Sequence, residues 1–185
     1  MKITLVCPAS LPATQFGGIM FLGVEIATEL AKKGHNVNIF TTDLDFANNA
    51  STFNKNLSKK ESINDFIINR THVWFSYKLF YVNLGMYFQM KNEKHDIIHT
   101  IGVRSFQSLI AAIISKKNKI PLIISDQGGL TTHPDLVKSS PIKKIMYKIQ
   151  NPLIKFIINQ TTKIIVPNEY EKKIFLEYAK DKKIV

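Results

Sequence analysis

The sequence predicts a single α/β domain in which a Rossmann-like parallel sheet is covered by helices on both faces. Short apolar runs alternate with longer amphipathic stretches along the whole chain, as they do when each strand is followed by a crossover helix. The runs are strongly apolar, which is typical of strands buried on both faces. The length of 185 residues suits one domain, spanning residues 1–185, better than two.

The first half of the chain is expected to supply three strands and two helices. Residues 3–7 and 37–42 are apolar runs that predict strands. Between them, residues 19–33 predict a helix with its apolar side chains on one face, and Gly34 ends it because glycine readily adopts the conformation that follows a helix. Residues 44–64 are rich in Asn, Ser and Lys and predict an exposed, mobile loop. Residues 66–75 predict a third strand, and the aromatic stretch 78–91 predicts a helix.

The second half continues the alternation. Residues 96–100, 121–125 and 164–166 predict strands, and residues 104–117 predict a helix that ends near Asn118. Residues 141–162 predict a helix bent at Pro152, because proline cannot donate a backbone hydrogen bond. Asn168 followed by Glu171 predicts a capping box at the start of a last helix. Ligands of such sheets bind at the carboxyl ends of the strands, so the loops after residues 7, 42, 100 and 125 are the places to search.

Composition excludes several classes of protein. The single cysteine, Cys7, excludes a disulfide framework and zinc sites of the paired-cysteine type. The first apolar run is too short for a signal peptide, and no run approaches the length of a membrane span. We therefore expect a cytoplasmic protein, either free or peripheral at the inner face of the membrane. The net charge of +11 favours phosphate-rich partners.

A pair of glycines, Gly17-Gly18, lies between the first expected strand and the first expected helix. Glycines let a ligand approach the backbone, and the helix start beyond them offers unpaired N–H groups to phosphate. A flexible turn explains the pair equally well. A dinucleotide fingerprint would place its glycines directly after the strand, whereas Gly17, Gly18 and Gly23 come late, although Asp43 after the second strand keeps that alternative open.

Several segments resemble the N-terminal half of family 4 glycosyltransferases. The Gly17-Gly18 loop is followed by a helix that ends in Leu-Ala-Lys-Lys-Gly-His-Asn-Val at residues 30–37. Asp-Ile-Ile-His at residues 96–99, Pro-Leu-Ile-Ile-Ser at 121–125 and Ile-Ile-Val-Pro-Asn at 164–168 then agree with the family in order and spacing. The resemblance spans essentially the whole chain.

The resemblance implies the GT-B architecture, in which two Rossmann-like domains face each other across a cleft. This chain would be the acceptor-binding N-terminal domain of a retaining enzyme that moves a sugar from a nucleotide-sugar to an acceptor hydroxyl. The C-terminal domain, which mainly holds the donor, is expected to be absent from this chain, so the domain alone should be inactive. Glu169 and Glu177 have the family's Glu-x7-Glu spacing, but they lie on the terminal helix of the wrong domain and are read as a solvated helix face.

The resemblance also implies roles for individual residues. The backbone at Gly17-Gly18 would contact the donor diphosphate. The loop after the fifth strand usually carries a functional His, and here Gln127 stands at that position. Gln127 can position hydroxyl groups but cannot exchange a proton, so Asp126 becomes the candidate base. The candidate acceptor contacts stand in the same loop and around the fourth strand: Gly128, His133, His99 and Arg104. The alternative for His133 is an exposed loop imidazole, for His99 a satisfied structural residue, and for Arg104 a solvated surface side chain.

Neither a metal nor a cofactor is expected. The acidic pair Asp43 and Asp45 is read as solvating the mobile loop rather than holding a metal. The segment 136–168 contains lysines and apolar residues but no Asp or Glu, so it predicts either a helix lying on an anionic membrane or one packed on the sheet. A lipid-linked or glycan acceptor fits the first reading. The main alternative function is a Rossmann-like nucleotide-binding or dinucleotide-binding module without transferase activity. Nucleic acid is not expected as a partner, because the chain lacks a recognisable reading motif.

Overall fold

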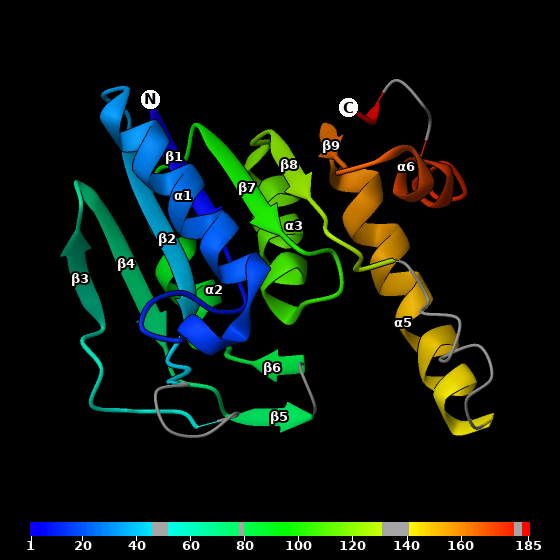
Figure 1. Cartoon of the computed structure of the whole chain (residues 1–185), viewed down its shortest axis with the longest axis horizontal. Helices are drawn as coiled ribbons and strands as arrows, with labels where there is room; N and C mark the ends of the chain where they lie inside the picture. The colour runs from blue at the N-terminus through cyan, green and yellow to red at the C-terminus, as the bar shows by residue number, and fades with distance from the viewer. Residues whose placement is uncertain (46–51, 78–79, 131–140, 180–182) are drawn as a thin grey trace.

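A computed structural model describes residues 1–45, 52–77, 80–130, 141–179 and 183–185, and in them a seven-stranded sheet has the order β3-β4-β2-β1-β7-β8-β9 (Figure 1). The strands are β1 (Lys2–Val6), β2 (Asn36–Thr42), β3 (Lys60–Ile63), β4 (Phe66–Thr71), β7 (Ile97–Ile101), β8 (Leu122–Ser125) and β9 (Lys163–Ile165). All neighbours pair in parallel except β3, which is antiparallel to β4. The predicted parallel sheet is therefore confirmed, with one antiparallel edge strand.

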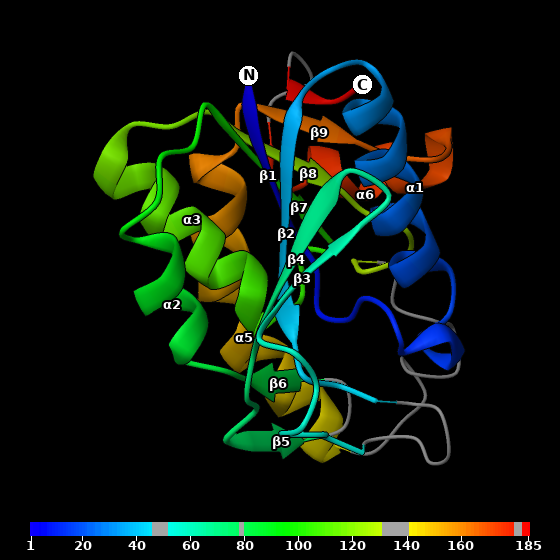
Figure 2. The same cartoon turned by 90° about the vertical axis from the view of Figure 1, so that its left-hand side faces the viewer.

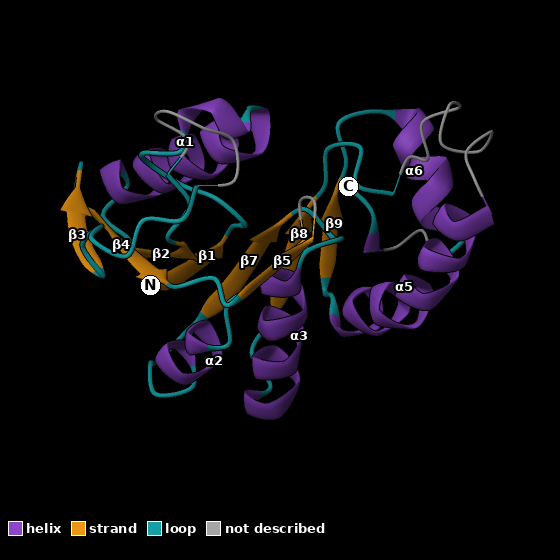
Figure 3. Cartoon of the chain, turned by 90° about the horizontal axis from the view of Figure 1, so that it is seen from below, coloured by secondary structure: helices purple, strands orange, loops and turns teal. Residues whose placement is uncertain are grey.

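Helices cover both faces of the sheet. Helix α1 (Gly18–Lys32) lies on one face, while α2 (Gly85–Met90) and α3 (Phe106–Asn118) lie on the other (Figures 2 and 3). Helix α5 (Pro141–Gln160) packs beside α3, and α6 (Glu169–Leu176) follows β9. Each face has its own core: Leu5 and Ile39 pack under α1, and Val6 and Phe40 pack toward α3. The alternation of neighbouring residues between the two cores is the period of a β-strand buried on both faces.

The predicted helix ends are largely confirmed. Gly34 follows α1 with φ of 80°, a conformation that glycine adopts without a steric penalty. The side chain of Asn168 accepts a hydrogen bond of 2.9 Å from the Glu171 backbone N–H, which confirms the expected cap of α6. Pro152 lies inside the single helix α5.

Three predictions between residues 44 and 91 are wrong. The expected loop contains β3, a strand of mainly exposed residues that sequence patterns of burial cannot reveal. The expected third strand stops at Thr71, and Phe75–Tyr77 forms a separate strand, β5. Of the expected helix 78–91, only the second part is helical: Phe80–Val82 forms β6, which pairs antiparallel with β5, and α2 follows at Gly85–Met90.

The described half of the basic helix α5 supports the packing of its apolar face on the sheet. Its apolar residues Ile154, Ile157 and Ile158 are at most 3% exposed and belong to the α3-side core. The side chains of residues 141–149 lie outside the described part. Within the described residues, no helix combines the length and apolar character that crossing a bilayer requires.

Helix α1 sits close to the sheet because Gly23 has no side chain. A methyl group placed on Gly23 would lie 2.8 Å from Sγ of Cys7 and 3.2 Å from Cδ1 of Ile101. These residues come from the carboxyl ends of β1 and β7, so α1 lies directly over these two strands. This contact fixes where the start of α1 stands relative to the loops that follow them.

Candidate functional site

The sheet reverses its winding between β1 and β7. The chain from β1 passes through α1 on one face to β2, whereas the chain from β7 passes through α3 on the other face to β8. The loops after β1 and β7 therefore separate and leave a crevice at the carboxyl ends of the strands, where open α/β sheets bind ligands.

The Gly17-Gly18 pair opens onto this crevice. Gly17 has φ of 95° and ψ of −157°, a backbone conformation that is essentially restricted to glycine. It is the N-cap of α1, and Gly18 is exposed. Among the described residues, none accepts a hydrogen bond from the N–H of Gly18 or Ile19. The first turn of α1 thus presents free N–H groups and the positive end of the helix dipole.

The loop after β8 brings Gln127 beside this helix start. Gln127 is exposed, and a methyl group placed on Gly18 would lie 3.6 Å from its side-chain Oε1. The two candidates are 109 positions apart in the sequence, yet the structure places them in contact distance, so a ligand held by the first turn of α1 lies within reach of the Gln127 amide.

Asp126 is buried and holds the loop that carries Gln127. Its Oδ1 accepts a 2.8 Å hydrogen bond from the Val103 N–H, its Oδ2 accepts one of 3.2 Å from the Leu130 N–H, and the Gly129 N–H donates to the carboxylate as well. Burial raises the pKa of Asp126, while the backbone N–H groups oppose that rise. The side chain is only 1% exposed, and a methyl group on Gly129 would clash with it. This geometry favours a structural role over that of a base.

Gly128, which follows Gln127 in the chain, is held in place by a side chain of α6. Its N–H donates a 3.0 Å hydrogen bond to Oε2 of Glu171. The loop after β8 is thus fixed from β7 through Asp126 and from α6 through Glu171. Such supports hold a functional side chain in one place better than a free loop does.

A groove of about 470 Å³ runs from Gln127 along the α1 face of the sheet. Its lining is mostly apolar, with Leu22, Ile26, Ile123 and Ile165 among the contributors. Its polar lining residues are Ser125, Asp126, Gln127 and His99, and Nε2 of His99 lies 2.8 Å from Oγ of Ser125. Burial lowers the pKa of His99 to about 4, so the imidazole is neutral at physiological pH.

This burial makes stability depend on pH. Between pH 6.5 and about 4 the unfolded state binds a proton at His99 that the folded state does not, so stability falls as the pH drops through this window. The loss should reach about 3 kcal/mol at most. We expect His99→Gln to flatten the fall of the unfolding free energy, measured by urea denaturation across this pH range. An unaltered slope in His99→Gln would show that His99 titrates normally in the folded protein.

Of the remaining candidates, Arg104 lies apart from this group. Arg104 contributes to a small cavity of about 20 Å³ between α3 and α5, on the other side of the sheet from Gln127. His133 lies outside the described residues. The structure therefore brings together Gly17, Gly18, Asp126 and Gln127, with His99 along the adjoining groove.

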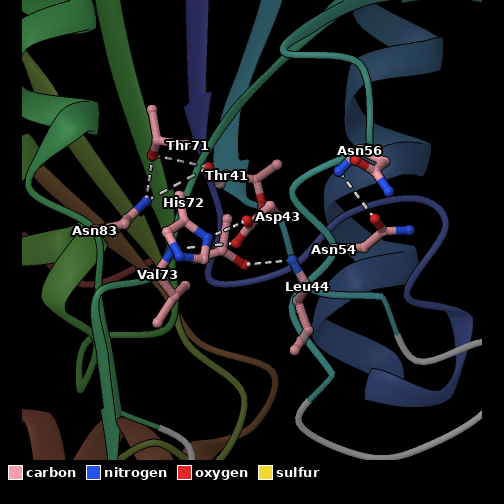
Figure 4. A network of polar contacts seen from close by, with 10 residues as sticks. Thr41, Asp43, Leu44, Asn54, Asn56, Thr71, His72, Val73 and Asn83 are labelled. Carbon is pink, nitrogen blue, oxygen red and sulfur yellow. Dashed lines mark hydrogen bonds and ion pairs between the residues drawn. The ribbon is translucent and has the colours of Figure 1, made fainter.

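The prediction that Asp43 solvates a loop is wrong. Asp43 is 4% exposed and binds the residues that follow β4: Oδ2 lies 2.5 Å from Nδ1 of His72, and Oδ1 accepts a 3.1 Å hydrogen bond from the Val73 N–H (Figure 4). Nearby, the side-chain amide of Asn83 donates to Oγ1 of Thr71 at 2.7 Å. Sequence reasoning missed this network, although both Asp43 and His72 directly follow strands of the sheet.

The described part of the chain contains no candidate metal site. Among the described residues, no three His, Cys, Asp or Glu side chains are grouped so that they could hold an ion. Asp43 points to His72 and not to a second carboxylate.

Comparison with solved structures supports the fold. The chain matches Anabaena HepE in complex with UDP with a TM-score of 0.59 at 13% identity, and the same protein in complex with UDP and glucose with a TM-score of 0.58 at 14% identity. Each match covers 100% of this chain but only 43% of the other. The chain thus spans less than half the length of these structures.

Sequence comparison gives the family. No curated protein matches the chain at a significant level. The model of Glycosyltransferase Family 4 matches residues 16–185. This range includes Gly17, Gly18, Gln127 and every residue that lines the groove except Ile3. This match covers most of the chain, and the sheet order agrees with the Rossmann-like half of the GT-B architecture. The chain belongs to glycosyltransferase family 4.

Proposed function

We propose that this chain is the acceptor-side domain of a retaining glycosyltransferase that moves a sugar from a nucleotide-sugar to an acceptor hydroxyl. The observation that carries the proposal is the free first turn of α1 beside Gln127, at the switch point of the sheet. HepE, with the same fold over this length, is described in complex with UDP and with glucose. A second, donor-binding half would complete the site.

In this proposal the backbone at Gly17 and Gly18 contacts the donor diphosphate. Negative charge builds up on the diphosphate as the sugar leaves, and free N–H groups at a helix start stabilise such charge without reorganisation. Glycine at both positions leaves the approach open, since no atom comes within 4 Å of a methyl group placed on Gly17. Cationic groups of the donor-binding half would neutralise the rest.

Gln127 would orient the reacting hydroxyl or sugar. Its amide both donates and accepts hydrogen bonds but does not exchange a proton at neutral pH. The acceptor would lie along the groove, where neutral His99 can form a hydrogen bond. Gly128, which follows Gln127 in the chain, would contact it as well. We do not place Arg104 in this site, because it belongs to a separate cavity.

The acceptor is proposed to be a glycan or a lipid-linked sugar. The mostly apolar lining of the groove suits an acceptor with a greasy portion. A peripheral position at the inner face of the membrane fits such an acceptor and the net charge of +11. The alternative function is a nucleotide-binding module without transferase activity, which the same helix start would support.

The test is sugar transfer with a panel of nucleotide-sugars, measured with the donor-binding half present. Gln127→Ala should lower kcat by about 10- to 100-fold, because one hydrogen bond to a reacting group is lost. The matched control is Gln160→Ala at the end of α5, which should keep full activity. Nucleotide binding without transfer from any donor would favour the alternative module instead.

A further inference from the structure

A second, cationic hollow lies toward the β3 edge of the sheet, whereas Gln127 follows β8 near the opposite edge. It has a volume of about 540 Å³, and the residues that define this edge hollow are Asp43, Lys55, Lys59, Thr71, His72 and Gln89. It is formed where the carboxyl ends of β2 and β4 meet the loop before β3 and helix α2. The strands β1 and β7 that carry the first site do not contribute to it.

Two lysines give the edge hollow its charge. Lys55 and Lys59 are both exposed, and among the described residues neither forms an ion pair with a carboxylate. Arg70 differs from them, because its guanidinium is buried, pairs with Glu61 at 2.6 Å and donates to the carbonyls of Leu11 and Ser58. The lysine charges are therefore available to a ligand, whereas that of Arg70 is already neutralised.

The carboxylate in the hollow, that of Asp43, offsets one of the two lysine charges and is turned toward the protein. Asp43 is 4% exposed, and its two oxygens are engaged by Nδ1 of His72 and the Val73 N–H. The same contact fixes the His72 ring, since a carboxylate that accepts from Nδ1 leaves Nε2 as the free nitrogen. The side chain of His72 is 37% exposed and lines the hollow, so this free nitrogen is accessible.

We propose that the edge hollow binds an oxyanion, such as a phosphate group, through Lys55 and Lys59, with Nε2 of His72 accepting a hydrogen bond from a hydroxyl of the ligand. Ammonium groups are standard donors to phosphate oxygens. For a transferase such a site would select acceptors that carry an acidic group, and that consequence alone rests on the proposed function. Binding of the anion itself requires neither a donor nor transfer.

The test is a titration of the protein with inorganic phosphate, followed by NMR through the backbone amide signals of residues 52–59 and 72. Saturable shifts confined to these residues are expected. Lys55→Gln and Lys59→Gln should each weaken binding by about fivefold, and the double variant by more than about tenfold, as loss of exposed charged contacts implies. Lys33→Gln is the matched control, because it removes an exposed lysine at the C-terminal end of α1, outside the hollow. This variant should bind phosphate as the unaltered protein does.

Further arms identify the source of the anion. Binding of glucuronate but not of glucose would indicate that the natural ligand is an acidic sugar. Binding to phosphatidylglycerol vesicles that depends on Lys55 and Lys59 would indicate a lipid headgroup. The absence of saturable shifts at residues 52–59 with phosphate overturns the proposal, and so does equal weakening in Lys33→Gln. If the protein bound phosphate in this way but transferred sugar from no donor with the donor-binding half present, the edge hollow would stand and the proposed function would fail.

Discussion

Replacing Asp126 with alanine should lower the free energy of unfolding by about 3 kcal/mol or more. The carboxylate accepts hydrogen bonds from the backbone of Val103, Gly129 and Leu130, and it is buried. Its removal leaves these N–H groups without partners in a place that water reaches poorly, and each unsatisfied group costs about 1–3 kcal/mol. Chemical denaturation followed by circular dichroism measures the loss.

The controls separate this structural role from the role of a base. Glu25→Ala removes an exposed carboxylate from α1 and should change the stability little. Asp126→Asn keeps one acceptor oxygen, so its stability should fall between those of the unaltered protein and the alanine variant. If Asp126→Asn were as stable as the unaltered protein but had lost sugar transfer, the geometric reading would be wrong, and Asp126 would be the base that the sequence suggested.

Gly18→Val should weaken binding of UDP by about 100-fold or more, measured by calorimetry with the donor-binding half present. A methyl group at this position already reaches ordinary contact with Gln127 at 3.6 Å. The branched side chain of valine extends further, over the free N–H groups of the first turn of α1, and blocks the approach of a diphosphate. The effect would lie on binding and not on folding, because Gly18 is in the helix and its φ is not among the positive values.

The size of the substituent provides the control. Gly18→Ala adds a methyl group that fits without a clash, so its loss of affinity should be about tenfold at most. The unfolding free energy of both variants should stay within about 1 kcal/mol of the unaltered value. Undiminished UDP binding by Gly18→Val would show that the diphosphate does not lie at this helix start.

The parts of the fold that follow from local rules could be predicted from the sequence. The strands around β1, β2, β7, β8 and β9 are short apolar runs, and the end of α1 and the start of α6 carry their signals in single residues, Gly34 and Asn168. The strand β3 could not be predicted, because an exposed, charged edge strand has no buried face to reveal it. The aromatic stretch 78–91, which contains β6 and α2, is predicted as one helix, because its pattern suits short strands as well as a helix.

The candidate site divides in the same way. Gly17 and Gly18 are predicted from their place between a strand and a helix, and Gln127 from the resemblance to family 4 glycosyltransferases. Their contact depends on the winding of the sheet around β1 and β7. The burial of Asp43 depends on His72, which is 29 positions away and becomes its neighbour only through the pairing of β2 with β4. The sequence suggests that Asp126 is a base, because no residue pattern shows that the backbone N–H groups of Val103 and Leu130 bind its carboxylate.

The free first turn of α1 also bears on how such a protein can diverge. Its donors belong to the main chain, so only a proline in the first turn can delete one of them, and other substitutions act only by adding bulk at Gly17 or Gly18. Selection at this place therefore acts on the absence of side chains and not on the presence of particular ones. The side chains around it are then free to change while the chemistry of the backbone stays constant.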